Sequence, residues 1–300
     1  MPRELTPCQL IERSLIKRFR KDIWNKFVMG LKEYKMINDG DKIAVCISGG
    51  KDSMLLAKCM QHLQKYSETD FELEFICMDP GYNERNRRRI EDNAKLMNIP
   101  IKFFETRIFG IVANQQQNPC YLCARMRRGH LYACAKELGC NKIALGHHFD
   151  DVIETILMGM IYGGQVQTMM PKLHSQNFKG MELIRPLYMV REEHIKQWVN
   201  YNDLEFIACA CRLTEKLGQA EKSGEVSKRQ EIKELIANLA KGNDFVETNI
   251  FKSVYNVNLR TVIEYEYKGK RYNFLDTYDD FDWERDRVIR DKADTGNEEE

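Results

Sequence analysis

Segment 48–53 constrains the fold of this chain more than any other part of the sequence. It reads Ser-Gly-Gly-Lys-Asp-Ser and lies between an apolar run at 42–47 and a run at 54–65 with helical spacing of its apolar residues. Adjacent glycines let the backbone turn sharply and approach a phosphate closely, and the N-terminus of the next helix offers N–H groups to an anion. The sequence therefore predicts a strand–loop–helix unit that binds phosphate.

Strands and helices are predicted to alternate along most of the chain, after a first helix over 8–35. The predicted strands are 42–47, 71–78, 99–104, 142–145, 183–187 and 206–208, and the main predicted helices are 54–65, 84–97, 124–138, a helix ending at 162, and 192–201. This alternation is typical of an α/β fold, with a parallel sheet covered by helices on both faces. A helix at 226–239 and a hairpin over 261–275 follow as a C-terminal extension.

We predict three parts on this basis. An N-terminal helical segment occupies 1–40, a central domain that carries the glycine loop occupies 41–215, and a C-terminal helix, hairpin and acidic tail occupy 216–300.

A second polar motif, Gly-His-His-Phe-Asp-Asp at 146–151, directly follows the predicted strand 142–145. Ligands of parallel sheets bind beyond the carboxyl ends of the strands, so both loops are predicted to project into one crevice. There Lys51 would hold a phosphate and Asp52 would hold the Mg²⁺ that accompanies a nucleotide. Asp151 is a candidate for metal binding or proton transfer. His147 and His148 either take part in the chemistry or brace the loop by hydrogen bonds.

The net charge of +1 hides an uneven distribution along the chain. Residues 271–300 contain five basic and eleven acidic residues, a net charge of −6, which leaves +7 for residues 1–270. Basic clusters lie at 17–21, at 85–89 and at Arg125, Arg127 and Arg128. Such clusters are either solvated helix faces or contacts for the phosphates of a nucleic acid.

Composition also limits the class of protein. Apolar residues make up 43% of the chain, enough for a packed core, so disorder throughout is excluded. The sequence contains no apolar run of about 18 residues, so we expect no membrane association. Residues 1–21 lack the apolar core of a secretion signal, so we expect a cytoplasmic protein.

Ten cysteines in a reducing compartment favour metal binding or reactivity over disulfides. Two close pairs stand out, Cys120 with Cys123 and Cys209 with Cys211. Three interpretations stay open: four thiolates could close a zinc site, three could leave one iron of a [4Fe–4S] cluster open, or one cysteine could carry a persulfide. The other six are expected to be mostly buried small apolar residues: Cys8, Cys46, Cys59, Cys77, Cys134 and Cys140.

Segment 48–53 matches the Ser-Gly-Gly-x-Asp-Ser signature, and the chain resembles the PP-loop ATP pyrophosphatases. These enzymes cleave ATP between the α and β phosphates and adenylate a substrate oxygen. The resemblance implies a fold like that of the adenine nucleotide alpha hydrolases. It also implies ATP binding at Ser48, Gly49, Gly50, Lys51, Asp52, Ser53 and Gly146.

Further motifs resemble the tRNA 2-thiocytidine synthesis family, the tRNA-cytidine 32 2-sulfurtransferases. They lie at 120–129, 144–151, 162–164, 170–173 and 184–187, and the resemblance covers about 15–240. It implies a [4Fe–4S] cluster held by Cys120, Cys123 and a third cysteine. The family's Cys-x-x-Cys-Gly-Ser-Gln segment is replaced here by Cys-Ala-Cys-Arg-Leu-Thr at 209–214. We place the third ligand at Cys211, because Arg229-Gln230 and a helix follow as in the family, with Cys209 as the alternative.

The resemblance implies an ATP-dependent tRNA sulfurtransferase that adenylates cytidine 32, inserts sulfur at C2, and releases AMP and pyrophosphate. Lys51, Asp52 and Asp151 would be catalytic, and Arg125, Arg127 and Arg128 would hold tRNA. The implied partners are tRNA, a sulfur donor such as a cysteine desulfurase, and a second copy of the chain as a homodimer. Two other classes stay open: a PP-loop adenylating enzyme acting on a small molecule or another tRNA base, and a zinc-stabilised nucleotide-binding protein.

Overall fold

The structure is a computed structural model that describes residues 5–106, 108, 119–207, 228–280 and 282. The side chains of residues 119–121, 123 and 124 also lie outside the description. The chain divides into two compact units, Met1–Phe251 and Lys252–Glu300. The predicted boundaries at 40 and 215 stay a prediction, and residue 215 lies outside the described residues.

A six-stranded sheet forms the centre of the first unit, in the order β3-β2-β1-β4-β6-β5. Its strands are β1 (Asp41–Cys46), β2 (Phe71–Asp79), β3 (Ile101–Glu105), β4 (Lys142–Ala144), β5 (Lys172–His174) and β6 (Glu182–Ile184). All neighbours pair in parallel except the edge strand β5, which is antiparallel to β6. The predicted α/β fold with a mainly parallel sheet is therefore confirmed, while three-residue β5 was not predicted because it is too short for a strand pattern.

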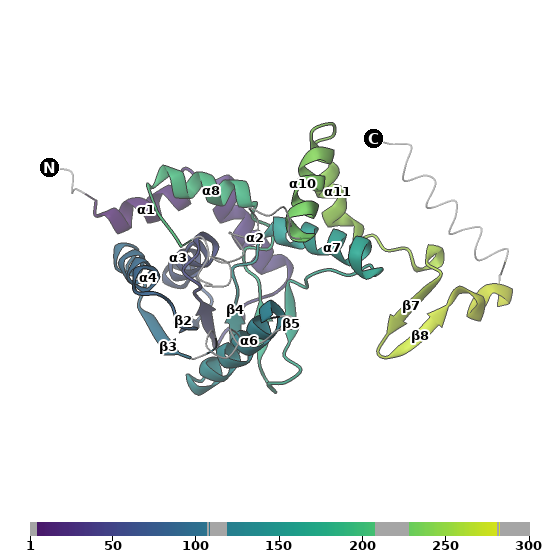
Figure 1. Ribbon diagram of the computed structural model, residues 1–300, viewed down its shortest axis with the longest axis horizontal. Coiled ribbons are helices and arrows are strands. Elements are labelled where there is room, and N and C mark those ends of the chain that lie inside the picture. The colour runs from purple at the N-terminus through teal and green to yellow at the C-terminus, as the bar shows by residue number, and fades with distance from the viewer. Residues whose placement is uncertain (1–4, 107, 109–118, 208–227, 281, 283–300) are drawn as a thin grey trace. The chain divides into compact units, whose positions relative to one another are not determined.

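Helices cover both faces of this sheet, with α3 and α4 on one side and α6 on the other (Figure 1). The helices of the first unit are α1 (Pro7–Ile16), a π-helix (Arg20–Trp24), α2 (Asn25–Glu33), α3 (Lys51–Tyr66), α4 (Glu84–Leu96), α6 (Pro119–Glu137), α7 (Phe149–Gly163), α8 (Glu192–Tyr201) and α10 (Lys228–Ala240), and α11 (Val246–Ser253) runs across the boundary. The π-helix interrupts the single helix that was predicted over 8–35.

Burial on both faces explains why β1 reads as a continuous apolar run. Ala44 and Cys46 pack with Tyr132 and Ala135 of α6 in one core cluster. Successive side chains of a strand point to opposite faces, so Ile43 and Val45, which are also fully buried, belong to the face that carries α3.

Three of the differences from the predicted elements bear on the site. Helix α3 begins at Lys51, so the second half of the glycine loop (Lys51, Asp52 and Ser53) is helical and forms the first turn of α3. Helix α6 begins at Pro119, a residue that suits a first helical position because it needs no N–H partner, so the Cys120/Cys123 pair lies inside the helix. The predicted strand 206–208 is wrong at 206 and 207, where the backbone is irregular; Asn93 of α4 donates to the Glu205 carbonyl there. Residue 208 lies outside the described residues.

The second unit contains the predicted hairpin, which is confirmed as β7 (Glu264–Tyr267) and β8 (Lys270–Asn273). Lys268 and Gly269 join the strands with positive φ angles of 52° and 75°, the geometry that a two-residue hairpin turn requires. Among the described residues, no helix is long and apolar enough to cross a membrane.

Candidate active site

A cavity of about 440 Å³ lies at the carboxyl ends of β1 and β4, where the two polar loops meet. We call it the central cavity. Its polar and charged lining residues are Ser48, Asp52, Ser53, Arg127, Arg128, Gly146, His147, Asp151 and Arg229, and its apolar lining includes Cys46, Ile47, Met78, Leu131, Ile143 and Leu145. The structure thus brings together predicted ATP-binding, catalytic and tRNA-binding residues from helices α3, α6 and α7 and from the loops before α3 and α7. The exposed Arg125 does not line the cavity, and neither do Gly49, Gly50 and Lys51.

The glycine loop, residues 48–53, is closed by its two serines. The Ser53 hydroxyl donates to the Gly50 carbonyl at 2.9 Å and accepts from the Ser48 N–H at 3.2 Å. Gly50 is the N-cap of the sixteen-residue helix α3, and within the described residues no side chain caps this end. The first turn of α3 therefore offers N–H groups and the positive end of the helix dipole to an anion.

Gly49 allows the sharp turn of this loop. Its φ of +84° lies in the left-handed region, and a Cβ atom there would approach Ile90 Cγ1 to 2.6 Å and Ile207 Cδ1 to 2.7 Å. Both the backbone angle and the packing therefore require glycine.

Replacing Gly49 with alanine should lower the free energy of unfolding by about 2 to 4 kcal/mol, which combines left-handed strain with overpacking. Gly40→Ala is the matched control, because Gly40 has a φ of +78° but nothing within 4 Å of the added methyl group. That control should lose only about 1 to 2 kcal/mol from strain. Urea unfolding of the two variants measures the difference, and equal losses would contradict the predicted clash.

Gly146 brings the second loop against the first turn of α3. A Cβ atom on Gly146 would lie 3.0 Å from both the Asp52 carbonyl carbon and the Ser53 nitrogen. Those neighbours are backbone atoms, which cannot rotate away. A glycine at 146 is therefore what lets the two loops line one cavity.

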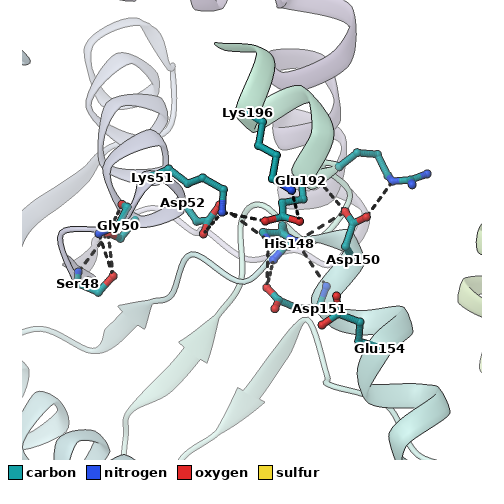
Figure 2. A network of polar contacts seen from close by, with 12 residues as sticks. Ser48, Gly50, Lys51, Asp52, His148, Asp150, Asp151, Glu154, Glu192 and Lys196 are labelled. Carbon is teal, nitrogen blue, oxygen red and sulfur yellow. Dashed lines mark hydrogen bonds and ion pairs between the residues drawn. The ribbon is translucent and has the colours of Figure 1, made fainter. Parts of the chain in front are cut away.

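The Lys51 ammonium lies between two carboxylates (Figure 2). Lys51 Nζ lies 3.2 Å from Asp52 Oδ2 and 3.0 Å from Glu192 Oε1 on α8. Burial acts to lower the pKa of Lys51, but the Asp52 and Glu192 carboxylates outweigh it and hold that pKa above its usual value. Lys51 is therefore a fixed ammonium cation at neutral pH.

Asp52 fits a divalent cation on one oxygen. Its Oδ1 is buried and has no hydrogen-bond partner among the described residues, and His148 Nε2 is 3.9 Å away, beyond hydrogen-bond distance. A buried carboxylate oxygen without a donor is an exception that a bound ion would explain. Oxygen ligands beside a phosphate site are what Mg²⁺ prefers. The residues therefore fit a Mg²⁺ ion that accompanies a nucleotide.

The two carboxylate oxygens of Asp151, by contrast, are already engaged. Oδ2 accepts the His148 backbone N–H at 3.0 Å, and Oδ1 lies 3.1 Å from Arg229 Nη2. His148 Nδ1 in turn accepts the Asp151 N–H at 3.4 Å, so His148 is the N-cap of α7. The geometry favours the bracing role for His148. Burial lowers the pKa of His147 to about 4, so that imidazole is neutral at pH 7.

Comparison with known proteins decides the family. Residues 21–214 match the family model described as the PP-loop domain. The chain is 33% identical over 259 residues to the tRNA-cytidine(32) 2-sulfurtransferase of Geotalea uraniireducens (strain Rf4), which covers 85% of this chain and 97% of that protein. It is 34% identical over 256 residues to the protein of the same name from Coxiella burnetii (strain RSA 493 / Nine Mile phase I), covering 83% and 95%. This chain belongs to the tRNA-cytidine(32) 2-sulfurtransferase family. The predicted resemblance is confirmed.

A solved structure supports the fold assignment of this family member. The U34-tRNA thiolase NcsA from Methanococcus maripaludis, determined with its [4Fe-4S] cluster, matches with a TM-score of 0.60 and 20% identity, over 78% of this chain and 79% of that chain. The predicted PP-loop fold is therefore confirmed.

Arg229 is a residue of this PP-loop site to which the sequence assigned no role. Its Nε lies 2.6 Å from Glu154 Oε2, and its Nη2 contacts Asp151, which is 78 positions away in the chain. Only the packing of α10 against α7 brings these groups together. The sequence around Arg229 shows only a basic residue in the first turn of a predicted helix, so its contacts with α7 could not be predicted from neighbouring residues.

The cysteines of this sulfurtransferase family member fall into two groups. Cys120 and Cys123 lie in the first turns of α6 with side chains outside the description, and Cys209 and Cys211 lie outside the described residues. The ligand set therefore stays a prediction; within the described part of the chain, no group of three or more metal-ligating side chains occurs.

The other cysteines are confirmed as mostly buried. Cys46, Cys59, Cys77 and Cys140 are buried, while Cys8 and Cys134 are half-buried. Burial raises the pKa of Cys77 to about 12 and that of Cys140 to about 11. These thiols are neutral at pH 7 and are poor nucleophiles.

Proposed function

We propose that this chain is an ATP-dependent tRNA sulfurtransferase that adenylates cytidine 32 of tRNA and replaces its C2 oxygen with sulfur. Membership in the tRNA-cytidine(32) 2-sulfurtransferase family, at 33 to 34% identity over most of the chain, carries this proposal. The central cavity supports it, because the glycine loop, two carboxylates and three arginines line one site.

The reaction has two displacement steps. The C2 carbonyl oxygen of the base attacks the α-phosphorus of ATP, and the bond from that phosphorus to the bridging oxygen breaks, so pyrophosphate leaves. A sulfur atom at the oxidation level of sulfide then bonds to C2, and the C2–O bond breaks to release AMP. Neither step oxidises or reduces the base.

The glycine loop and the N-terminus of α3 bind the phosphates in this proposal. Ser48 and Ser53 add hydroxyl groups, and the backbone at Gly49, Gly50 and Gly146 leaves room for close approach. The open Oδ1 of Asp52 would hold Mg²⁺, and the ion would supply positive charge beside the phosphates. Lys51 adds a cation at the edge of the site.

The base enters from the side of α6 and α7. Asp151 lines the cavity beside His147 and is proposed to orient the base or move its proton. Arg127 and Arg128 line the same cavity and are proposed to hold tRNA phosphates, with Arg125 as an outer contact on the exposed face of α6. A base in an anticodon loop is single-stranded, so it reaches such a cavity without the cost of opening a duplex.

Cys120, Cys123 and Cys211, with Cys209 as the alternative third ligand, are proposed to hold a [4Fe–4S] cluster. When bound, it would supply an open iron position for the sulfur. A cysteine desulfurase together with a reductant would supply that sulfur as sulfide. A second copy of the chain as partner, and a cytoplasmic location, are also proposals.

An in vitro thiolation assay tests the function. Anaerobically purified protein is incubated with ATP, Mg²⁺, sulfide and a tRNA transcript that has cytidine at position 32. We expect AMP, pyrophosphate and 2-thiocytidine, measured by nucleoside mass spectrometry. A transcript with another base at position 32 is the control and should stay unmodified.

Other outcomes distinguish the alternatives. Pyrophosphate release that does not depend on tRNA would favour an adenylating enzyme for a small molecule. Colourless protein with zinc at unit stoichiometry and no pyrophosphate release would favour a zinc-stabilised nucleotide-binding protein.

The tRNA contact has its own measurement. Arg127→Gln should weaken tRNA binding and reduce the slope of log affinity against log salt by about 1. Arg271→Gln on β8 is the control, because Arg271 lies in the net-acidic segment 271–300 and pairs with Glu264 across the hairpin. An unchanged salt slope for Arg127→Gln would exclude a phosphate contact.

A further inference from the structure

Two carboxylates hold the ammonium group of Lys51 in place (Figure 2). Asp52 Oδ2 lies 3.2 Å and Glu192 Oε1 lies 3.0 Å from Lys51 Nζ. A lysine ammonium has three N–H donors, so these contacts take two and leave one. The remaining donor has a defined direction, which a lysine on a flexible stem does not otherwise have.

The Glu192 carboxylate is itself held by two further lysines. Its Oε2 lies 2.9 Å from Lys196 Nζ on the same helix and 2.7 Å from Lys233 Nζ on α10. Burial acts to raise the pKa of Glu192, but hydrogen bonds from Lys233, Lys196 and Lys51 outweigh it and hold the pKa far below its usual range. The carboxylate therefore stays ionised, and its side chain is only 13% exposed.

The backbone of Glu192 is tied to the other loop of the site. Its N–H donates to Asp150 Oδ2 at 2.7 Å, and Asp150 belongs to the motif at 146–151. Glu192 thus contacts the first turn of α3 through its side chain and the first turn of α7 through its backbone. A residue in this place can set where Lys51 sits relative to the central cavity.

We propose that Glu192 is a positioning residue, which orients the Lys51 ammonium toward the phosphates of ATP. The proposal rests on the proposed function, since it needs ATP at the glycine loop. Glu192 touches neither base nor nucleotide in this role; it acts through Lys51. Lys196 and Lys233 keep its carboxylate in one position.

The direction in which Glu192→Gln changes the affinity for ATP distinguishes a positioning role from a simple charge effect. Removing a carboxylate near an anion site should tighten ATP binding if charge alone matters. If Glu192 positions Lys51, then Glu192→Gln should instead weaken ATP binding by about tenfold. It should lower kcat/KM for pyrophosphate release by at least as much, because a small displacement of a binding group slows a reaction strongly. Calorimetric titration of the full chain with ATP and Mg²⁺, without tRNA, gives the affinity.

Glu193→Gln is the matched control on the same helical turn. Glu193 is exposed, and its carboxylate accepts from Gln197. We expect that variant to bind ATP as the wild type does. Thermal unfolding of both variants checks that α8 remains folded.

A double-mutant cycle with Lys51→Ala tests whether Glu192 acts through Lys51. In that background, Glu192→Gln should change ATP affinity by less than about twofold, since the group that it positions is gone. The same loss in both backgrounds, or tighter ATP binding by Glu192→Gln, would overturn the proposal. Wild-type protein that fails to bind ATP would contradict the proposed function instead. Equal ATP affinities for the wild type and Glu192→Gln would contradict the Glu192 proposal and leave the proposed function standing.

Discussion

Replacing Asp52 with asparagine should slow ATP-dependent pyrophosphate release by about a hundredfold or more, with little change in folding. Asparagine keeps the shape of the side chain but removes the charge that would bind Mg²⁺. The open oxygen, Oδ1, has no hydrogen-bond partner among the described residues, so the fold does not depend on it. The other oxygen pairs with Lys51, which keeps Glu192 as a second partner, so the free energy of unfolding should fall by no more than about 1 to 2 kcal/mol.

Two controls make this result specific to the metal. Asp92→Asn, at an exposed position of α4, removes the same charge away from the cavity and should leave the rate unchanged. Raising the Mg²⁺ concentration should partly restore the Asp52→Asn rate if the loss is one of metal affinity. If Asp52→Asn releases pyrophosphate at the wild-type rate, Mg²⁺ is held by another residue. Asp151 would then be the next candidate ligand.

Replacing Cys211 with alanine should abolish the iron–sulfur cluster and with it tRNA thiolation, whereas Cys209→Ala should keep both. A three-cysteine cluster that loses one ligand is no longer held, since each thiolate binds a different iron. The measurement is iron and sulfide content after anaerobic purification, followed by nucleoside mass spectrometry of tRNA from cells that carry each variant.

The two variants control for each other because they lie two positions apart in the same segment. The reverse pattern would move the third ligand to Cys209. Loss of metal in both variants, with zinc in the wild type, would favour a closed four-cysteine zinc site.

Some features of the site follow from local sequence alone. The turn at Gly49 needs a positive φ, and the following apolar spacing needs a helix, so the strand–loop–helix unit was predictable from consecutive residues. The first residue of α3 was not, since Lys51, Asp52 and Ser53 are compatible with either a loop or a first helical turn. The strand predicted at 206–208 is wrong at 206 and 207, where the backbone pairs with no strand and Ile207 packs against Gly49 of the glycine loop.

The electrostatic roles of the acidic residues were beyond local prediction. Asp52 and Asp151 look equivalent in sequence, each just after a polar loop that follows a strand. In the structure Arg229 and the His148 N–H occupy both oxygens of Asp151, while Asp52 keeps one oxygen open. The difference comes from α10, a helix far along the chain.

The sequence by itself determined the family, through its motifs. It also determined the mainly parallel sheet and the strand–loop–helix unit at 41–66, because strand and helix periodicity and the need for glycine are properties of neighbouring residues. Only the tertiary structure decided that Glu192 and Arg229 belong to the site and that Asp52 is its open carboxylate. Those facts depend on which side chains α8 and α10 bring to the carboxyl edge of the sheet, and the contacts join residues too distant in sequence to show a pattern.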